Sequence, residues 1–182
     1  MDKKILIVVD MQNDFIDGSL GTTEAQAIVT NVKKKIEEYK SYGNPIIFTQ
    51  DTHYADYLNT SEGKMLPVEH CIRLTNGWNI HHDLLEIIND LECLVIEKPT
   101  FGSINLMWEI EDMIDNYGNN IELEFVGLCT DICVVSNVLM AKAYYPDLKI
   151  VVDASCCAGV TTEKHKAALE VMKSCQVDVI GE

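Results

Sequence analysis

Residues 4–15 have the sequence KILIVVDMQNDF, and this stretch decides the fold class. Its apolar run, Ile5 to Val9, is short and continuous, and Asp10 follows the last apolar residue directly. A run of this kind is typical of a strand buried on both faces, as in a parallel sheet covered by helices. We therefore predict that a strand over residues 4–9 begins an α/β fold.

The rest of the chain repeats this pattern, with short apolar runs separated by stretches of helical spacing. The further predicted strands are 45–49, 93–97, 122–127, 149–153 and 177–180, and the predicted helices are 24–42, 80–91, 104–117, 131–144 and 161–173. Such alternation indicates βαβ crossovers. We expect one domain over residues 1–182, with a three-layer α/β/α, Rossmann-like architecture around a mostly parallel sheet of about six strands. Residues 50–77 show no clear period, and an irregular stretch of this length is usually functional.

The charge of the chain disfavours two classes of partner. The sequence has 29 acidic and 14 basic residues, a formal net charge of −15, and no long block of Lys or Arg. A surface this acidic is a poor partner for nucleic acid and for anionic membranes. The first apolar run is too short for a signal peptide or a membrane span, so we expect a cytoplasmic protein.

The seven cysteines do not indicate a disulfide framework. They are odd in number and scattered, at positions 71, 93, 129, 133, 156, 157 and 175. No C-x-x-C pair is present, which disfavours a Cys-rich structural zinc site. Apolar interiors accept free Cys readily, so we expect all of them except Cys133 to be core residues.

Reactive side chains follow several predicted strands, where open α/β sheets bind their ligands. Asp10 follows the first strand, Lys98 the third, and Cys133 lies in the first turn of the helix after the fourth. A helix N-terminus and a neighbouring cation both favour a thiolate. We predict that Cys133 attacks a carbonyl carbon, that Asp10 carries the proton, and that Lys98 supports the negative charges.

The stretch after the second strand carries possible metal ligands, which are Asp51, His53, Glu62 and His70. Two imidazoles and two carboxylates suit one divalent ion, with zinc first and manganese, iron or cobalt as alternatives. On spacing alone, a solvated loop is the better explanation of these four residues. These residues follow the second predicted strand, which should end beside Asp10. This position favours a metal site over a solvated loop.

Each of these interpretations has a structural alternative. Asp10 could form an Asx turn or cap a helix, Lys98 could be solvated, and Thr130 and Asp131 could cap the helix that follows. Three other histidines receive no role: His81 and His82 open a helix and are expected to face solvent, and His165 is expected on the surface.

Four motifs carry a resemblance to a known family over nearly the whole chain. They are DMQNDF at 10–15, DTH at 51–53, KPTFGS at 98–103 and GLCTDICV at 127–134. With them the chain resembles the isochorismatase-like cysteine hydrolases, and within these the bacterial nicotinamidase/pyrazinamidase branch. The resemblance implies Asp10, Lys98 and Cys133 as a catalytic triad. It also implies a cis peptide bond between Leu128 and Cys129, with the backbone N–H groups of Cys129 and Cys133 forming the oxyanion hole.

The resemblance extends to the metal and the substrate pocket. It implies one divalent ion held through Asp51, His53 and His70, with Glu62 as a further ligand, and it implies a homo-oligomer. Phe15 and Phe101 are candidates for stacking against a substrate ring. Residues 67–70, PVEH, depart from the Pro-rich approach that many nicotinamidases have before the last His, and Leu66 stands where an aromatic residue is often found.

These features predict a metal-assisted cysteine amidohydrolase that converts nicotinamide or pyrazinamide to the acid and ammonia through a thioester. One alternative is a related cysteine hydrolase of another small amide or carbamoyl compound. A hydrolase of isochorismate is disfavoured because that chemistry does not require the metal ligands. A small-molecule binder without catalysis is a further alternative, although no residue of the triad is missing.

Overall fold

The fold is built on one parallel sheet. A computed structural model describes residues 3–89, 93–118 and 120–182. The strands lie in the order β3-β2-β1-β4-β5-β6, and each neighbouring pair is parallel. Their bounds are β1 (Lys3–Val9), β2 (Ile46–Asp51), β3 (Leu94–Lys98), β4 (Ile121–Leu128), β5 (Lys149–Ala158) and β6 (Asp178–Ile180). The predicted α/β fold is confirmed, and the sheet is wholly rather than mostly parallel.

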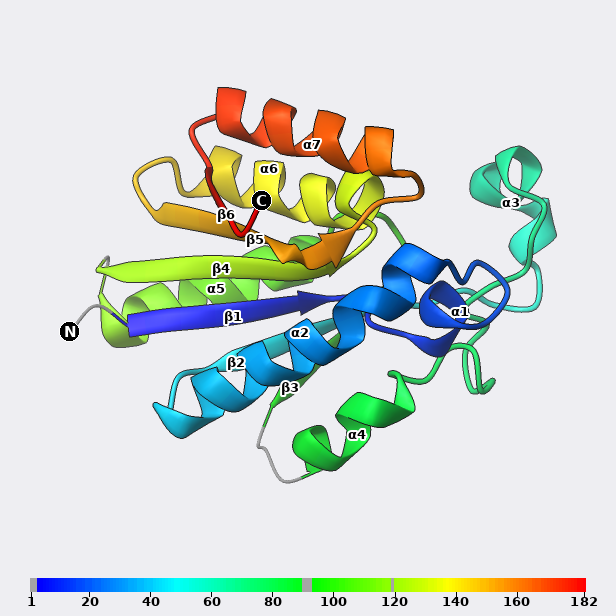
Figure 1. Cartoon of the computed structure of the whole chain (residues 1–182), viewed down its shortest axis with the longest axis horizontal. Helices are drawn as coiled ribbons and strands as arrows, with labels where there is room; N and C mark the ends of the chain where they lie inside the picture. Colours follow the sequence, from blue (N-terminus) through cyan, green and yellow to red (C-terminus); the bar gives the residue numbers. More distant parts are fainter. Residues whose placement is uncertain (1–2, 90–92, 119) are drawn as a thin grey trace.

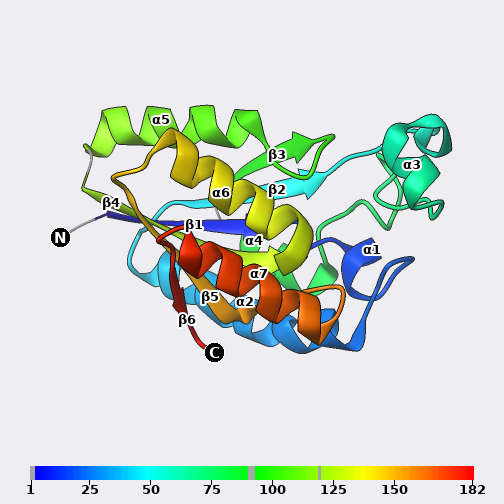
Figure 2. The same ribbon diagram turned by 90° about the horizontal axis from the view of Figure 1, so that it is seen from above.

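Helices cover both faces of the sheet (Figure 1 and Figure 2). One face packs against α2 (Thr23–Ser41) and α4 (His82–Asn89), the other against α5 (Ile104–Tyr117), α6 (Val135–Tyr144) and α7 (Thr162–Ser174). Because side chains of a strand alternate between the two faces, β1 contributes to both cores. Ile5, Ile7 and Val9 pack under α5 to α7, while Leu6 and Val8 pack under α2.

Two predictions about local structure are wrong in part. Residues 50–77 are not wholly irregular, since they contain a 3₁₀ turn, η1 (Tyr57–Asn59), and a short helix, α3 (Ser61–Met65), which Thr60 caps by accepting the Gly63 N–H. The helix predicted over 131–144 starts with a π-helical turn, η2 (Thr130–Val134), before α6 begins. A short helix, α1 (Asn13–Ile16), follows β1. The predicted helix 80–91 corresponds to α4, and its last two residues lie outside the described ranges.

The strand order creates a binding edge in the middle of the sheet. The chain winds outward from β1 through β2 to β3, and then in the opposite direction through β4, β5 and β6. A crevice forms at the carboxyl ends of the strands where the winding reverses, here between β1 and β4. There Gly127 pairs with Val9, and a Cβ on Gly127 would collide with the Val9 carbonyl. Glycine therefore lets the two strands approach just before Asp10 and Cys133.

No helix within the described ranges is both long enough and apolar enough to cross a membrane. The cytoplasmic location and the lack of nucleic-acid or membrane partners stay predictions.

Candidate active site

Asp10, Lys98 and Cys133 lie together at the carboxyl edge of the sheet. Asp10 follows β1, Lys98 is the last residue of β3, and Cys133 lies in η2 after β4. Lys98 Nζ is 2.6 Å from Asp10 Oδ2 and 3.6 Å from Cys133 Sγ. All three side chains are buried, and Cys133 borders a cavity of about 830 Å³. The grouping predicted from the sequence is present, while the catalytic roles stay predictions.

Lys98 also links this grouping to the predicted metal ligands. Its Nζ lies 3.4 Å from Asp51 Oδ1 and donates to the Thr100 carbonyl at 3.1 Å. Burial lowers the pKa of Lys98, but the negative charges of its neighbours, Asp10 first, outweigh it and raise that pKa. Lys98 is therefore an ammonium ion, and its side chain is 1% exposed, which excludes the solvated alternative for this residue.

Cys133 is buried beside both a carboxylate and a cation, and these two neighbours have opposite effects on its pKa. Burial raises the pKa of Cys133 well above its usual value, and the charge of Asp10 raises it further, against the lowering effect of Lys98. The attractive effect of one cation is too small to outweigh complete burial beside a carboxylate. The thiol therefore needs a base to become a nucleophile, and Asp10 is the carboxylate beside it.

Asp10 is held in an unusual backbone conformation by its neighbours. Its φ is 48°, in the left-handed region that few residues other than Gly adopt. Its Oδ1 accepts the Thr49 hydroxyl at 2.7 Å, which leaves Oδ2 toward Lys98. Burial raises the pKa of Asp10, and the Lys98 ammonium offsets part of that rise. Side chains in such positions cluster at functional sites, where surrounding contacts maintain them.

The peptide bond between Leu128 and Cys129 is cis, as the family resemblance implied. The Cys129 carbonyl accepts the N–H groups of Ile132 and Val134, at 3.0 and 3.1 Å, and so closes the turn that carries Cys133. The use of the Cys129 and Cys133 N–H groups as an oxyanion hole stays a prediction.

The predicted metal ligands converge on one point next to the triad. Asp51 Oδ2 is 3.0 Å from His53 Nε2 and 3.6 Å from His70 Nε2. Glu62 Oε1, from α3, lies 3.7 and 3.6 Å from the same two nitrogens. Burial lowers the pKa of His53, but the Asp51 carboxylate outweighs it and raises that pKa.

Two observations indicate that this cluster fits a divalent ion. His53 Nε2 is buried and faces the cluster, and within the described ranges it forms no hydrogen bond of good geometry, although Asp51 Oδ2 lies 3.0 Å away. Without its proton, this nitrogen would offer a lone pair to an ion in the cluster. The other nitrogen of His70, Nδ1, is 2.9 Å from the Val68 carbonyl, which directs Nε2 inward as in metal-binding histidines. Asp51, His53 and His70 each offer one ligand atom, and these atoms lie within 4.8 Å of one another. The buried set can therefore bind a metal, while the role of Glu62 stays a prediction.

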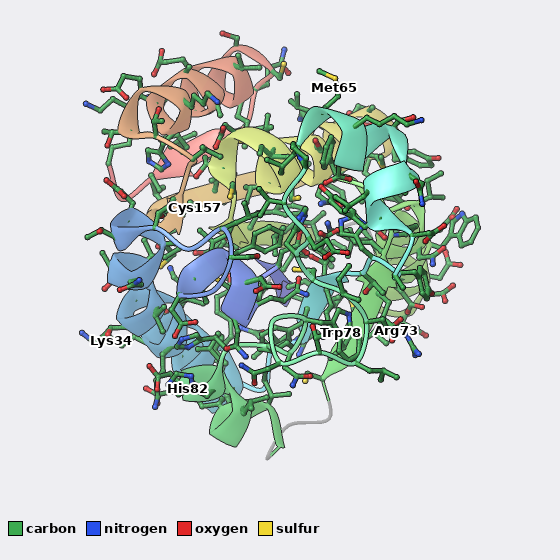
Figure 3. All side chains as sticks on the ribbon, turned by 90° about the vertical axis from the view of Figure 1, so that its right-hand side faces the viewer. Lys34, Met65, Arg73, Trp78, His82 and Cys157 are labelled. Carbon is green, nitrogen blue, oxygen red and sulfur yellow. The ribbon has the colours of Figure 1, made fainter. Side chains whose placement is uncertain are left out.

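Two aromatic rings pack against the metal cluster, and of these the sequence analysis singled out Phe15 but not Tyr57. The buried Tyr57 ring lies 4.7 Å from the His53 ring and 5.0 Å from the His70 ring, between centroids. Phe15 packs 5.5 Å from His70. Of the two predicted stacking residues, Phe15 is 9% exposed and Phe101 is 46% exposed, and both line the cavity. Figure 3 looks onto this end of the molecule, with Met65 of α3 at the cavity rim.

Several residues that position the site were missed by the sequence analysis. The Gln12 amide donates to the Asp51 carbonyl at 2.8 Å and accepts the Asp51 N–H at 2.7 Å. Asn137, one helical turn after Cys133, donates to the Cys133 carbonyl at 2.8 Å and accepts the Ser103 N–H at 2.9 Å. It thereby joins the turn of the nucleophile to the segment after Lys98. The motif that contains Gln12 was quoted, but nothing in its spacing shows what the side chain contacts.

The structure also corrects two of the three predictions about the exposure of the histidines that received no role. His81 was expected to face solvent, yet it is 5% exposed. Its backbone N–H donates to the Met11 carbonyl at 2.9 Å, which holds the start of α4 against the segment after β1. His165 is half-buried rather than on the surface, and its Nδ1 is 2.8 Å from the hydroxyl of Thr130 in η2. The prediction for His82 is confirmed, since it is exposed.

Known proteins are similar to this chain at low sequence identity. A sequence model of the Isochorismatase domain matches residues 4–182. The nicotinamidase/pyrazinamidase of Mycobacterium tuberculosis is 26% identical over 192 residues, which cover 97% of this chain and 98% of that protein. A probable inactive nicotinamidase of Arabidopsis thaliana is 28% identical over 180 residues, covering 93% and 87%.

Solved structures of similar proteins superpose over nearly the whole chain. The nicotinamidase/pyrazinamidase of Bacillus subtilis gives a TM-score of 0.85 at 27% identity, covering 98% of this chain and 99% of that one. The pyrazinamidase of Pyrococcus horikoshii in complex with zinc gives 0.80 at 26% identity, covering 99% of each. The N-carbamoylsarcosine amidase of Thermoplasma acidophilum gives 0.78 at 27% identity, covering 98% and 95%. With a family match from residue 4 to residue 182, this chain belongs to the isochorismatase family.

Proposed function

We propose that the protein is a metal-assisted cysteine amidohydrolase that converts nicotinamide, or its analogue pyrazinamide, to the acid and ammonia. The observation that carries this proposal is the position of Lys98. One buried ammonium contacts Asp10, Cys133 and Asp51. It thereby joins the base to the nucleophile and to the metal ligands, and both of these line one cavity. The similarity to nicotinamidases and to a zinc-containing pyrazinamidase supports this substrate and this metal.

The first half of the reaction forms a thioester. Asp10 accepts the thiol proton of Cys133, and the sulfur attacks the carboxamide carbon. The carbonyl electron pair moves to oxygen, where the N–H groups of Cys129 and Cys133 stabilise the negative charge. When the intermediate collapses, the C–N bond breaks, and Asp10 returns its proton to the nitrogen, which leaves as ammonia. Lys98 keeps Asp10 ionised before the transfer.

The second half of the reaction releases the acid. A water molecule loses a proton to Asp10 and attacks the thioester carbon. Collapse of this intermediate breaks the C–S bond, and the sulfur recovers the proton from Asp10. A divalent ion, zinc in the first instance, would be held by Asp51, His53 and His70 with Glu62 beside them, and would supply a Lewis acid that anchors the ring nitrogen. Phe15 and Phe101 would bind the faces of the ring.

A second substrate class is a small carbamoyl compound or another amide. The likeness to an N-carbamoylsarcosine amidase, at a TM-score of 0.78, supports this alternative.

Ammonia release tests the proposal. Chelator-treated protein is supplied in turn with zinc, manganese and iron, and ammonia is measured from nicotinamide, pyrazinamide and N-carbamoyl amino acids. We expect release from nicotinamide that falls at least about a thousandfold in Cys133→Ala, because a covalent nucleophile is lost. The double variant Asp51→Ala/His53→Ala should lose both bound metal and activity.

The results separate the alternatives. Release from N-carbamoyl compounds but not from nicotinamide would reject the nicotinamidase and support the second substrate class. Activity that persists in Cys133→Ala would reject the covalent mechanism. Binding of nicotinamide by calorimetry without turnover of any amide would indicate a binding protein.

A further inference from the structure

A second group of possible metal ligands lies outside the catalytic cavity. Asp17, which follows α1, meets His81 and His82 at the start of α4, and each offers one ligand atom within 4.8 Å of the others. These residues line a separate pocket of about 270 Å³, together with Asp83 and part of α2. In Figure 3, His82 lies on the α4 side of the molecule, far from Met65 at the rim of the catalytic cavity.

We propose that Asp17, His81 and His82 form a second binding site for a borderline divalent cation such as zinc, which clamps the turn after α1 onto the start of α4. Two imidazoles and a carboxylate are a ligand set that zinc, nickel and cobalt prefer. No part of this proposal depends on the hydrolase reaction.

The spacing of the ligand atoms suits such an ion after a small adjustment. Ligand atoms about 2.0–2.1 Å from a tetrahedral zinc are roughly 3.3 Å from one another. Asp17 Oδ2 is 3.8 Å from His81 Nε2, and the ligand atoms of all three residues lie within 4.8 Å of one another. Because Asp17 is 48% and His82 68% exposed in the side chain, both can rotate toward the fixed, buried His81.

The surroundings of His81 favour a ligand role. His81 is 5% exposed, and its Nε2 lies on the side of the ring toward Asp17. At the other ring nitrogen of His81, Nδ1, the Asp83 N–H donates at 3.4 Å, and Asp83 Oδ2 lies 3.9 Å away. Binding of an ion through Nε2 would therefore place the imidazole proton on Nδ1, where it would face the Asp83 carboxylate instead of the Asp83 N–H. Asp83 also offsets the positive end of α4, which would otherwise repel a cation.

A metal here would join two segments that already touch beside the active site. The His81 N–H donates to the Met11 carbonyl at 2.9 Å, and Gln12 forms an antiparallel bridge with Ile80. On the other side of α1, Phe15 lines the catalytic cavity. The ion would therefore restrain the segment that carries Asp10 and Phe15 without entering the cavity.

Zinc stoichiometry tests the inference with a readout that does not require activity. Chelator-treated protein is titrated with zinc in a calorimeter and, separately, loaded, desalted and measured for zinc content. We expect two zinc ions per chain in the unmodified protein, and one in either His81→Gln/His82→Gln or Asp51→Ala/His53→Ala. His165→Gln, which changes a histidine outside both clusters, should keep two.

Asp17→Asn is a second variant for the case in which the histidine variant does not fold. The Asp17 side chain is half-exposed, so this substitution should not disturb the fold. We expect it to weaken one of the two zinc sites at least tenfold. In Asp51→Ala/His53→Ala, zinc should still raise the melting temperature, and added His81→Gln/His82→Gln should abolish that rise. If His81→Gln/His82→Gln, folded by circular dichroism, binds as much zinc as the unmodified protein, or if desalting removes zinc from this site, the inference is wrong. If zinc fails to bind at the Asp51 site but still binds at Asp17, His81 and His82, the result contradicts the proposed hydrolase and leaves this inference supported.

Discussion

The direction of the Asp10 carboxylate depends on one hydroxyl group. Thr49 donates to Asp10 Oδ1 at 2.7 Å, and the Asp10 N–H lies 3.3 Å from the same Thr49 oxygen. A carboxylate that accepts a hydrogen bond is stabilised in its charged form, which is the form that a general base needs. Thr49 is therefore a positioning residue for the proposed proton transfer.

Replacing Thr49 by Val tests this role, since Val has a similar shape and lacks the donor. A hydrogen bond to a charged group contributes roughly 1.5–3 kcal/mol, so we expect kcat/KM for the amide to fall about tenfold to a hundredfold. Loss of the bond raises the pKa of Asp10, so the acid limb of the pH–rate profile should move to higher pH. Thr49→Ser, which keeps the hydroxyl, should restore both values. A Val variant with an unmoved acid limb would contradict the role.

At the scale of elements, an ionic cluster attaches α2 to the sheet. Lys35 of α2 lies 2.7 Å from Glu124 of β4 and 2.8 Å from Asp153 of β5, measured from Nζ to the carboxylate oxygens. Tyr39, one turn further along α2, donates to the other oxygen of Glu124 at 2.5 Å. These contacts place α2 over β4 and β5, while its first residues, including Ala25, line the catalytic cavity.

The cluster predicts a dependence of stability on pH. Burial raises the pKa of Asp153, but Lys35 and Ser155 lower it more, so the folded pKa lies below the unfolded value of 3.8. A lowered carboxyl pKa stabilises the folded state above the unfolded pKa, and this contribution is lost as pH falls through the folded pKa. We expect Asp153→Asn to lower the free energy of unfolding by about 1–2 kcal/mol at pH 7, since solvent screens part of the pair.

Urea unfolding between pH 3 and pH 7 measures this effect. The difference between Asp153→Asn and the unmodified protein should shrink below about pH 4, where the unmodified carboxylate also takes up a proton. Glu170→Gln, which removes an exposed partner of Lys173, is the matched control and should leave the pH dependence unchanged. A difference that stays constant from pH 7 to pH 3 would show that Asp153 acts through packing rather than charge.

At the scale of the whole molecule, the sheet has an edge that exposes apolar side chains. Leu94 and Val95 of the edge strand β3 are both more than a third exposed, and Trp108 of α5 is more than half exposed. Unpaired edges and apolar patches favour association. We expect a homo-oligomer, in which sedimentation velocity gives a mass of at least twice 20.5 kDa. A monomeric mass at every concentration would reject this expectation.

The sequence alone determined the α/β layout and the chemical identity of the site. Continuous apolar runs specify strands buried on both faces, and helical spacing between them leaves few possible topologies. Because parallel strands bring their carboxyl ends to one edge, Asp10, Lys98 and Cys133 could be grouped from their places after strands. Asp51 and His53 could be grouped in the same way, whereas the cis bond at Leu128 was implied only by the family resemblance.

Only the tertiary structure decided which distant side chains contact the site residues and how burial and charge shift their pKa values. The contact between Thr49 and Asp10 joins residues 39 positions apart, and the Lys98–Cys133 contact joins residues 35 apart. Local patterns of sequence report periodicity and capping, but not which distant side chain fills a given space. Burial and the sum of nearby charges determine the pKa of a group, so the pKa of Cys133 is raised despite its cationic neighbour. His81 likewise is buried although it begins a polar turn.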